Sequence, residues 1–253
     1  MWMLEDWPSG REDGGMTTGA PDLTRLAGTL GDATRIRMLG LLMDGRALTA
    51  KELAYGSGVG PATATGHLQR LAADKLVVST VQGRYKYFRI ATPEVAACME
   101  AMLVLAPRAG AQGNRDASAT PDPVREARFC YDHLAGKLGV AITARLLSGG
   151  RLNPAPGAEP RYDLTAQGEK WFAGVGVDVR RVREQRRRFA CPCLDWSERR
   201  DHLAGALGAA LADALLVRGW IVREREGRVA RVTAAGVRGL KSSLRLSWPL
   251  SAG

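Results

Sequence analysis

The stretch from residue 48 to residue 71 constrains the fold more than any other part of this chain of 253 residues. It predicts two short helices joined by a glycine-rich turn at residues 56–60, because glycine adopts positive φ angles at little cost. Thr49 is a good N-cap for the first helix. Pro61 suits the first turn of the second helix, where its missing N–H would be unpaired in any case. The pattern therefore predicts a packed helix–turn–helix pair.

The second helix of this pair is predicted to have two different faces. Ala64, Leu68 and Leu71 recur at helical spacing and form an apolar face. The opposite side is small and polar, as a helix that enters the major groove of DNA requires. On this basis we predict DNA contacts by Ala62, Thr63, Thr65, Gly66, His67, Gln69 and Arg70. An ordinary helical hairpin packed in a core is the alternative interpretation of the helix pair alone.

A β-hairpin is predicted directly after the helix pair. Residues 76–81 and 84–90 are rich in β-forming side chains and are separated by a Gln-Gly turn. Arg84, Lys86 and Arg89 make the hairpin basic, which suits a wing that lies along DNA phosphates. We therefore add Arg84 and Lys86 to the predicted DNA-binding residues.

With these elements in this order, residues from about 26 to 105 resemble the winged helix-turn-helix domain of the ArsR (arsenic-repressor-like) bacterial transcriptional regulators. The resemblance is carried by residues 30–39, 52–54 and 62–68. It implies a dimeric, ligand-responsive repressor of transcription. In proteins of this type the first and last helices of the domain pair across the dimer. Residues 23–30 and 95–105 are apolar enough to do so here.

Two metal sites known from this family are missing in the sequence. Arsenic-sensing relatives carry cysteines in the helix before the recognition helix, where residues 51–55 of this chain contain none. Zinc-sensing relatives carry Asp and His residues in the helix after the wing, where this chain has Cys98 and Glu100 without a histidine. We therefore expect any effector to act through the C-terminal half.

The overall charge agrees with a nucleic-acid partner without deciding the matter. A formal net charge of +10 favours a polyanion, and double-stranded DNA is the partner we predict, bound by a homodimer. The four cysteines do not form the framework of a disulfide-rich protein. No apolar run approaches the length of a membrane span, and the first residues lack the pattern of a signal peptide. We expect a cytoplasmic protein without membrane contact.

The sequence contains no pattern that predicts an enzyme. A nucleophile–base pair, a metal triad or a phosphate-binding glycine loop would be needed, and none occurs in a recognisable context. The alternative to a DNA-binding regulator is a winged-helix protein–protein interaction module without specific DNA binding, because fold alone does not fix function.

The chain is predicted to be α+β and mainly helical, with two domains. Residues 1–20 read as a disordered tail and residues 21–106 as the winged helix-turn-helix domain for DNA binding and dimerisation. Residues 107–124, rich in Gly, Ala, Ser and Pro, read as a linker. Residues 125–248 follow as a duplicated sensing or assembly domain.

The duplication is visible in the sequence of the C-terminal half. DHLAGKLG at residues 132–139 reappears as DHLAGALG at residues 201–208, and two TAxG segments start at Thr165 and Thr233. We predict two copies of a helix–β-hairpin–helix unit that fold against each other. Between them, residues 178–188 contain six arginines and read as a solvated helical connector, with an auxiliary phosphate contact as the alternative.

The densest set of potential ligands also lies in this half. Cys130 and His133 are three residues apart and would share one helical face. Ser197 would cap the helix that contains His202. Thiolate and imidazole suit soft metals, whereas a carboxylate, an indole and a guanidinium suit an organic anion. The predicted effector-binding residues are Cys130, His133, Cys193, Asp195, Trp196, Arg199 and His202.

Several interpretations of this set stay open from the sequence alone. The cysteines precede their histidines by different spacings, so Cys130 and Cys193 are not predicted to be equivalent. This weakens a symmetric metal site and leaves a mixed polar pocket. A metal ion or a small-molecule effector is possible, as is a thiol redox signal. The histidines would otherwise serve packing only.

Overall fold

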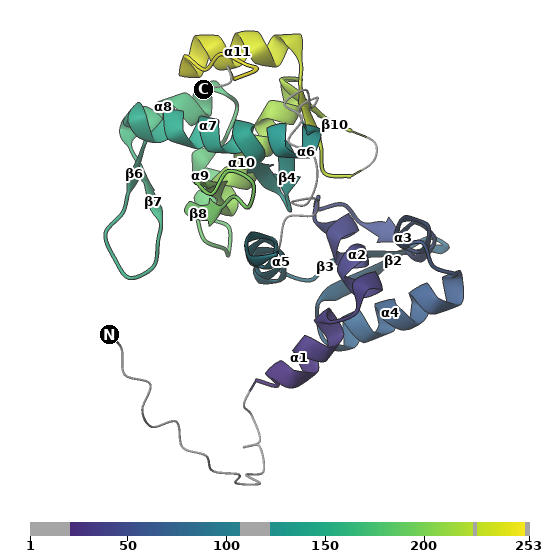
Figure 1. Ribbon diagram of the computed structural model, residues 1–253. Helices are drawn as coiled ribbons and strands as arrows, with labels where there is room; N and C mark the ends of the chain where they lie inside the picture. Colours follow the sequence, from purple (N-terminus) through teal and green to yellow (C-terminus); the bar gives the residue numbers. More distant parts are fainter. Residues whose placement is uncertain (1–20, 107–121, 225–226, 251–253) are drawn as a thin grey trace, which may run out of the picture.

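The computed structural model describes residues 21–106, 122–224 and 227–250. The chain forms two hydrophobic cores, one before and one after the gap at residues 107–121 (Figure 1). The predicted tail, residues 1–20, and most of the predicted linker lie outside the described residues. The prediction of a mixed, mainly helical α+β chain is confirmed. Among the described residues, no helix is long and apolar enough to cross a bilayer.

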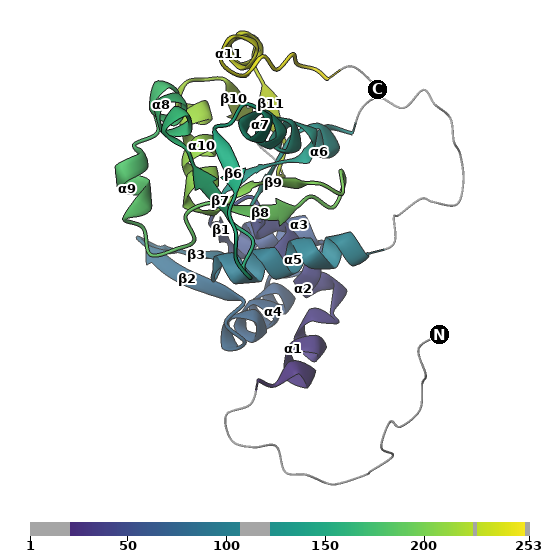
Figure 2. The same cartoon turned by 90° about the vertical axis from the view of Figure 1, so that its left-hand side faces the viewer.

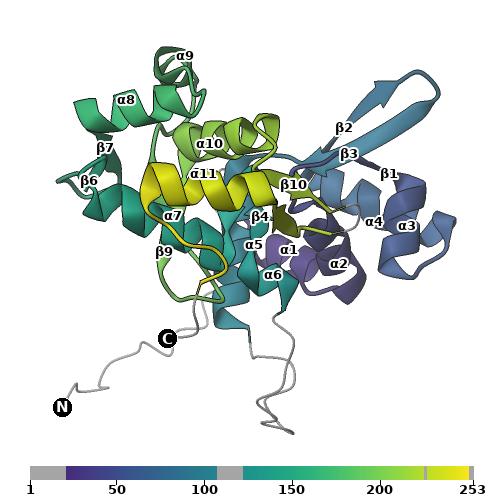
Figure 3. The ribbon, with the colours of Figure 1, turned by 90° about the horizontal axis from the view of Figure 1, so that it is seen from above.

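The N-terminal core is a winged helix-turn-helix. Its elements are α1 (Leu23–Leu30), α2 (Ala33–Leu42), β1 (Leu48–Thr49), α3 (Ala50–Ser57), α4 (Pro61–Ala73), β2 (Val77–Gln82), β3 (Tyr85–Ile90) and α5 (Pro93–Leu105). Strand β3 lies between β1 and β2 in an antiparallel sheet. Helices α3 and α4 form the predicted pair, and the β2–β3 hairpin is the wing, which projects from the core in Figure 3.

Local capping explains where the helix pair begins and ends. The Thr49 side chain accepts a hydrogen bond from the backbone N–H of Glu52, whose carboxylate accepts from the N–H of Thr49 at 2.7 Å. Gly58 ends α3 at a φ of 70°. Pro61 opens α4. The predicted apolar face of α4 is buried, with Ala64, Leu68 and Leu71. The sequence therefore predicted this element pair correctly.

The C-terminal core contains the same order of elements twice. Its elements are α6 (Pro123–Glu126), β4 (Arg128–Cys130), β5 (His133–Ala135), α7 (Gly136–Ser148), β6 (Leu152–Pro154), β7 (Tyr162–Leu164), α8 (Ala166–Gly174), α9 (Val179–Arg183), β8 (Cys191–Leu194), β9 (Asp201–Ala204), α10 (Gly205–Val217), β10 (Ile221–Arg223), β11 (Ala230–Val232) and α11 (Ala234–Leu244). Both β4 to α8 and β8 to α11 read hairpin, helix, hairpin, helix. We call these segments the first and second units.

Each unit contains the predicted helix, hairpin and helix, but it begins with a short hairpin that the sequence did not predict. Helix α6 begins at Pro123, inside the predicted linker. The predicted arginine-rich connector is helical only in α9, which ends at Arg183. The additional hairpins, β4–β5 and β8–β9, are antiparallel pairs of three and four residues per strand.

The first helices of the two units lie close to the preceding hairpins. A Cβ atom added at Gly139 of α7 would lie 2.4 Å from a backbone carbonyl oxygen and 3.5 Å from the Cβ of His202. At Gly208 of α10 the corresponding distances are 2.4 Å and, to the Cβ of His133, 3.4 Å. Each helix therefore needs glycine at this point, and at this glycine each helix packs against the histidine of the other unit.

The two histidines lie on strands, which corrects the prediction that they belong to helices. Cys130 pairs with His133 across the β4–β5 hairpin, so they do not share a helical face. The reason is the turn between them, where Tyr131 has a φ of 61° and closes a tight hairpin. Ser197 lies in the turn between β8 and β9 and caps no helix.

The positions of the two cysteines also differ from the prediction. Cys193 pairs with His202 across the β8–β9 hairpin, as Cys130 pairs with His133 across β4–β5. The cysteines therefore occupy equivalent places in their hairpins. The unequal sequence spacing arises because the second hairpin has the longer turn.

The two cores contact each other directly. Helix α5 lies between the winged-helix core and strand β8 (Figure 2). The Tyr131 N–H donates to the carbonyl of Met43 at 2.6 Å. The Arg223 guanidinium donates to the carbonyl of Asp44 at 2.8 Å. A change in either core can therefore reach the other through these contacts and through α5.

Candidate functional site

Helix α4 presents an open, polar face to solvent. A Cβ atom added at Gly66 would meet no described atom within 4 Å. Because this face carries no bulky side chain, base edges can approach the helix closely. The predicted DNA-binding residues on this exposed face are Ala62, Thr63, Thr65, Gly66 and Gln69.

His67 and Arg70, also predicted to contact DNA, are held by neighbouring elements. His67 is half-buried, and its Nδ1 lies 3.8 Å from the Oδ1 of Asp32, the N-cap of α2. The Arg70 Nε donates to the Oγ1 of Thr29 at 2.9 Å and lies 3.1 Å from the Asp74 carboxylate. Both side chains therefore fasten α4 to the start of the domain.

The basic wing and α4 border a common groove. Gln69 from α4 and Lys86 from β3 line a cavity of about 350 Å³. Arg84 is exposed at the tip of the wing, where its guanidinium lies 5.0 Å from the ring centroid of Tyr85. A side chain suited to base edges and one suited to phosphates thus border one groove, and a second basic side chain lies at the tip of the wing.

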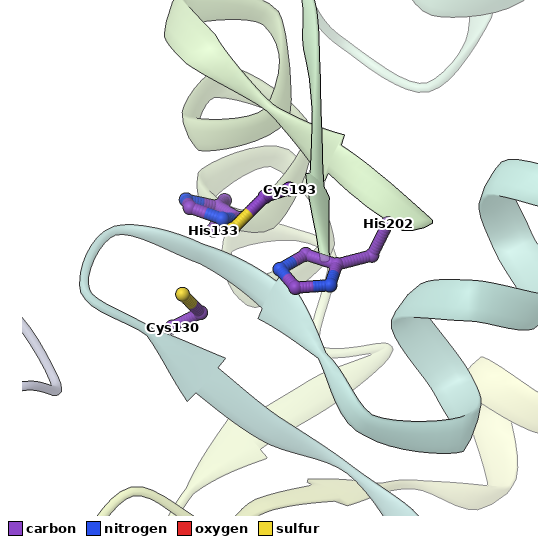
Figure 4. Close-up of side chains that lie close together, drawn as sticks. All are labelled: Cys130, His133, Cys193 and His202. Carbon is purple, nitrogen blue, oxygen red and sulfur yellow. The ribbon is translucent and has the colours of Figure 1, made fainter. Parts of the chain in front are cut away.

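A second candidate site lies where the first hairpins of the two units meet. Cys130, His133, Cys193 and His202, which we call the cysteine–histidine cluster, have potential ligand atoms that all lie within 4.8 Å of one another (Figure 4). The imidazole centroids of the two histidines are 5.1 Å apart. Three of the side chains are buried and Cys193 is half-buried. The fold thus brings together four of the seven predicted effector-binding residues.

Each histidine of the cluster has a carboxylate next to one ring nitrogen. The Nδ1 of His133 lies 3.0 Å from Asp132, and the Nδ1 of His202 lies 3.5 Å from Asp195. The Nε2 atoms of both histidines are buried without a hydrogen-bond partner among the described residues. In Figure 4 the ring of His202 points toward the other three side chains. His133 thus shows an arrangement common in metal-binding histidines, a carboxylate on one nitrogen and the other nitrogen free, whereas the Nδ1 of His202 has a carboxylate nearby but no hydrogen bond.

The cluster favours one thiolate. A hydrogen bond from Cys130 holds the pKa of Cys193 well below its usual range against the effect of burial, and both histidines act in the same direction. The same contact, together with burial, raises the pKa of Cys130. Burial disfavours the charged form of His133, but contacts with Asp132 and Cys193 outweigh it and raise the pKa of His133 to about 9. These shifts favour the charged forms of Cys193 and His133, a thiolate next to an imidazolium.

Asp195 and Trp196 surround a buried arginine, although they were predicted to line a ligand pocket. The Nη2 of Arg128 donates to Asp195 at 3.0 Å, and its guanidinium lies 4.6 Å from the Trp196 ring centroid. Burial disfavours the charged form of Asp195, but Arg128 outweighs it and lowers the pKa of Asp195 to about 2. Arg199 lies exposed in the β8–β9 turn. These three residues therefore lie outside the cluster.

Arg128 also connects the second site to α5. Its side chain is fully buried, and its Nη2 lies 4.0 Å from the Oε2 of Glu100 on α5. Glu100 is itself buried and accepts a hydrogen bond from Arg228. This link was not predicted from the sequence, although an arginine directly before two apolar residues, Phe129 and Cys130, was a usable signal.

A cavity of about 460 Å³ opens beside the cluster. It lies between the start of α5 and the first hairpins of the two units, and three members of the cluster are among its lining residues. Three consecutive arginines, residues 186–188, also line it, and Arg187 pairs with Asp132. The predicted solvated connector thus contributes directly to the surroundings of the cluster, and the cavity gives a ligand access to it.

The chain is similar over most of its length to a known bacterial protein. YdfF of Bacillus subtilis (strain 168), an HTH-type transcriptional regulator, is 38% identical over 216 residues, which are 85% of this chain and 94% of YdfF. No family model matches the chain.

Solved structures resemble about a third of the chain. The homodimeric winged helix-turn-helix DNA-binding domain of Mb0332 from Mycobacterium bovis, a possible ArsR-family transcriptional regulator, is 29% identical with a TM-score of 0.31, over 33% of this chain and 76% of that one. Reduced HlyU from Vibrio cholerae N16961 is 22% identical with a TM-score of 0.31, over 34% of this chain and 90% of that one.

Proposed function

Since the chain belongs to the HTH-type transcriptional regulators, with an ArsR-type winged helix-turn-helix in its N-terminal half, we propose that it is a dimeric, sequence-specific repressor released by an effector. The expectation that the chain is a DNA-binding regulator and not an enzyme is confirmed by this membership. That it represses transcription, forms a dimer and responds to an effector is our proposal.

The observation that carries DNA recognition is the open face of α4 next to a basic wing. Gln69 is exposed on α4 and shares a groove with Lys86, so one side of the domain offers base contacts and phosphate contacts together. We assign sequence preference to α4, and general affinity to Arg84 and Lys86.

The dimer is proposed from exposed apolar side chains on the first and last helices of the domain. Leu23 of α1 is 72% exposed, and Leu103 and Leu105 of α5 are 36% and 84% exposed. Burying them in a two-fold interface removes this apolar surface from water. Two recognition helices would then lie about 34 Å apart, one turn of DNA.

We assign the DNA-binding and dimerisation domain to residues 21–106 and the sensing domain to residues 125–248. The sensing domain is inferred to be two copies of one unit, because the same elements recur and each unit receives the other's histidine at equivalent glycines. The effector is placed at the cysteine–histidine cluster, next to α5. Double-stranded DNA in the cytoplasm is the proposed target.

Selection from a random DNA pool by the purified full chain tests this function. We expect enrichment of an inverted repeat, with an affinity that falls steeply as salt rises, because Lys and Arg contacts release counterions. An absence of sequence enrichment, with weak binding that is equal for all sequences, would overturn the proposal in favour of a protein–protein interaction module.

A further inference from the structure

We propose that the cysteine–histidine cluster binds one Zn²⁺-class ion with tetrahedral Cys₂His₂ coordination, and that this ion is the effector that acts on α5. The metal site stands on the geometry of the cluster alone. Its regulatory role rests on the proposed function.

The spacing of the cluster fits a four-coordinate ion. Metal–sulfur bonds of about 2.3 Å and metal–nitrogen bonds of about 2.0 Å place tetrahedral ligand atoms roughly 3.3–3.8 Å apart. The four potential ligand atoms here all lie within 4.8 Å of one another. Small side-chain rotations would bring them onto one ion, because the residues come from two facing hairpins of similar geometry.

The unpartnered histidine nitrogens are the second observation. A buried polar atom without a hydrogen bond is costly, yet the Nε2 atoms of His133 and His202 are both in this state among the described residues. Metal coordination would satisfy both. The Asp132 carboxylate, 3.0 Å from the Nδ1 of His133, would hold that ring as the Nδ1–H tautomer, which directs its Nε2 lone pair to the ion. Asp195, 3.5 Å from the Nδ1 of His202 without a hydrogen bond, can take the same role once a metal occupies the Nε2.

The donor chemistry selects the class of ion. Sulfur and imidazole nitrogen in a tetrahedral arrangement suit Zn²⁺, whereas Ca²⁺ and Mg²⁺ require oxygen ligands. Two thiolates and two neutral imidazoles balance the charge of a divalent cation, so the loaded site carries no net charge into the protein interior. The neighbouring cavity, which reaches Cys130, His133 and Cys193, supplies the entry path.

A chain of buried contacts connects the ion to α5. The Oδ2 of Asp195 lies 3.5 Å from the Nδ1 of His202 and accepts from Arg128 at 3.0 Å. A metal on the Nε2 of His202 fixes the proton on Nδ1 and adds this N–H as a donor to Asp195. The added donor competes with Arg128, which also lies 4.0 Å from Glu100 of α5. Metal binding thereby weakens the contact of Arg128 with Asp195 in favour of Glu100. Glu100 lies on α5, the proposed dimer helix.

The metal site is tested by titrating the reduced, chelator-treated full chain with Co²⁺ as a spectroscopic stand-in for Zn²⁺. We expect one equivalent per chain, thiolate-to-cobalt charge-transfer absorption, a tetrahedral visible spectrum, and displacement by Zn²⁺. Cys193→Ser should lose the charge-transfer intensity of one thiolate and bind at least tenfold more weakly. Cys191→Ser is the matched control, because Cys191 is a buried cysteine on the same strand outside the cluster.

The wild-type spectrum keeps this test decisive if a variant fails to fold. Binding of Co²⁺ without thiolate absorption, no binding by the folded wild-type chain, or an unchanged affinity in folded Cys193→Ser would each overturn the metal site. A Cys130–Cys193 disulfide that forms readily in a chain unable to bind Co²⁺ would reassign the cluster to thiol redox chemistry.

The regulatory role is tested separately by DNA binding with and without one equivalent of Zn²⁺. We expect operator affinity to change by about fivefold or more in the wild type, as typical coupling between sites does. Glu100→Gln should bind Co²⁺ normally but lose most of this change. Operator affinity that ignores Zn²⁺ in a metal-binding chain overturns the effector role alone. Failure to bind any specific DNA, with a normal cobalt spectrum, overturns the proposed function and leaves the metal site standing.

Discussion

Among single residues, Arg128 is a fully buried charge that lies between two carboxylates from different parts of the chain. Its guanidinium donates to Asp195 and lies near Glu100, and it rests on the Trp196 ring. A buried ion pair adds little to stability compared with an apolar replacement of the whole group, but removal of one partner leaves the other charge uncompensated. Arg128 therefore supplies the counter-charge that the two buried carboxylates, Asp195 and Glu100, require.

We predict that Arg128→Leu destabilises the chain by about 3–5 kcal/mol, because Asp195 and Glu100 lose a buried counter-charge. Urea unfolding followed by circular dichroism measures the loss. Arg231→Ala is the control, since the Arg231–Glu224 pair is largely exposed and worth less than about 1 kcal/mol. A loss of the same size in both variants would contradict the structural role of Arg128.

Two residues bordering the groove between α4 and the wing should separate sequence preference from general affinity. Gln69→Ala should cost about 1–3 kcal/mol against the preferred site and relax the preference at one base position. Lys86→Ala should weaken binding to all sequences alike and flatten the salt dependence. Fluorescence anisotropy with specific and random duplexes over a salt series gives both quantities. Equal ratios for the two variants would contradict this division.

At the scale of elements, the packing of α7 and α10 depends on a backbone approach that only glycine permits. The Cβ atoms that Gly139 and Gly208 lack would each lie 2.4 Å from a carbonyl oxygen of a neighbouring strand. This close contact lies within each unit, and next to it the Cβ of the other unit's histidine lies 3.4–3.5 Å from the missing Cβ, so the same glycines also let the two units pack on their shared core.

We predict that Gly139→Ala and Gly208→Ala each destabilise the chain by about 1–3 kcal/mol, the usual cost of overpacking. Gly40→Ala is the matched control: it lies in α2, and its Cβ would meet no described atom within 4 Å. That change should stabilise by about 0.5–1 kcal/mol, because alanine is the better helix former. Chemical unfolding of the three variants decides the matter, and stable alanine variants at both seam positions would refute the close contact.

The dimer helices give a second element-scale prediction. Leu103→Glu on α5 should convert the dimer to monomers, because a charge would enter an apolar interface. Val217→Glu is the control, since Val217 is 89% exposed at the end of α10, away from the proposed interface. Sedimentation velocity at micromolar concentration distinguishes the species. A wild-type chain that sediments as a monomer would end the dimer proposal before either variant is made.

At the scale of the whole molecule, the two cores are joined through backbone contacts near Gly45. This residue has a φ of 76°, and its missing Cβ would lie 2.6 Å from the carbonyl oxygen of Tyr131 in the other core. The wing residue Gly83 has a similar φ of 60° but no described atom within 4 Å of its missing Cβ. A comparison of substitutions at Gly45 and Gly83 therefore separates the effect of backbone strain from the effect of contact between the cores.

We predict that Gly45→Ala destabilises the chain by more than Gly83→Ala, and that the difference reflects the clash with the second core. Both variants pay about 1–2 kcal/mol for a left-handed conformation. Hydrogen exchange should speed up in the β4–β5 hairpin only for Gly45→Ala. Identical exchange in the two variants would show that the cores do not depend on this contact.

Local sequence determined the winged helix almost completely. Thr49, Pro61 and the glycine turn encode the limits of α3 and α4, and spacing alone identifies the buried face of α4, because these signals act over one or two helical turns. The internal repeat predicts two similar units, and this duplication belongs to the proposed function. His67 and Arg70 show the limit of this reasoning, since their partners Asp32 and Thr29 are distant in sequence.

The geometry of the cysteine–histidine cluster depends on tertiary structure. The sequence named its four members, but a three-residue spacing fits a helix turn and a tight hairpin equally, so their geometry was predicted wrongly. The contacts of Arg128 with Asp195 and Glu100 join three separate elements, and nothing local encodes them. Residue types and local secondary structure follow from the sequence, whereas the contact between the two hairpins and α5 depends on how the two cores pack.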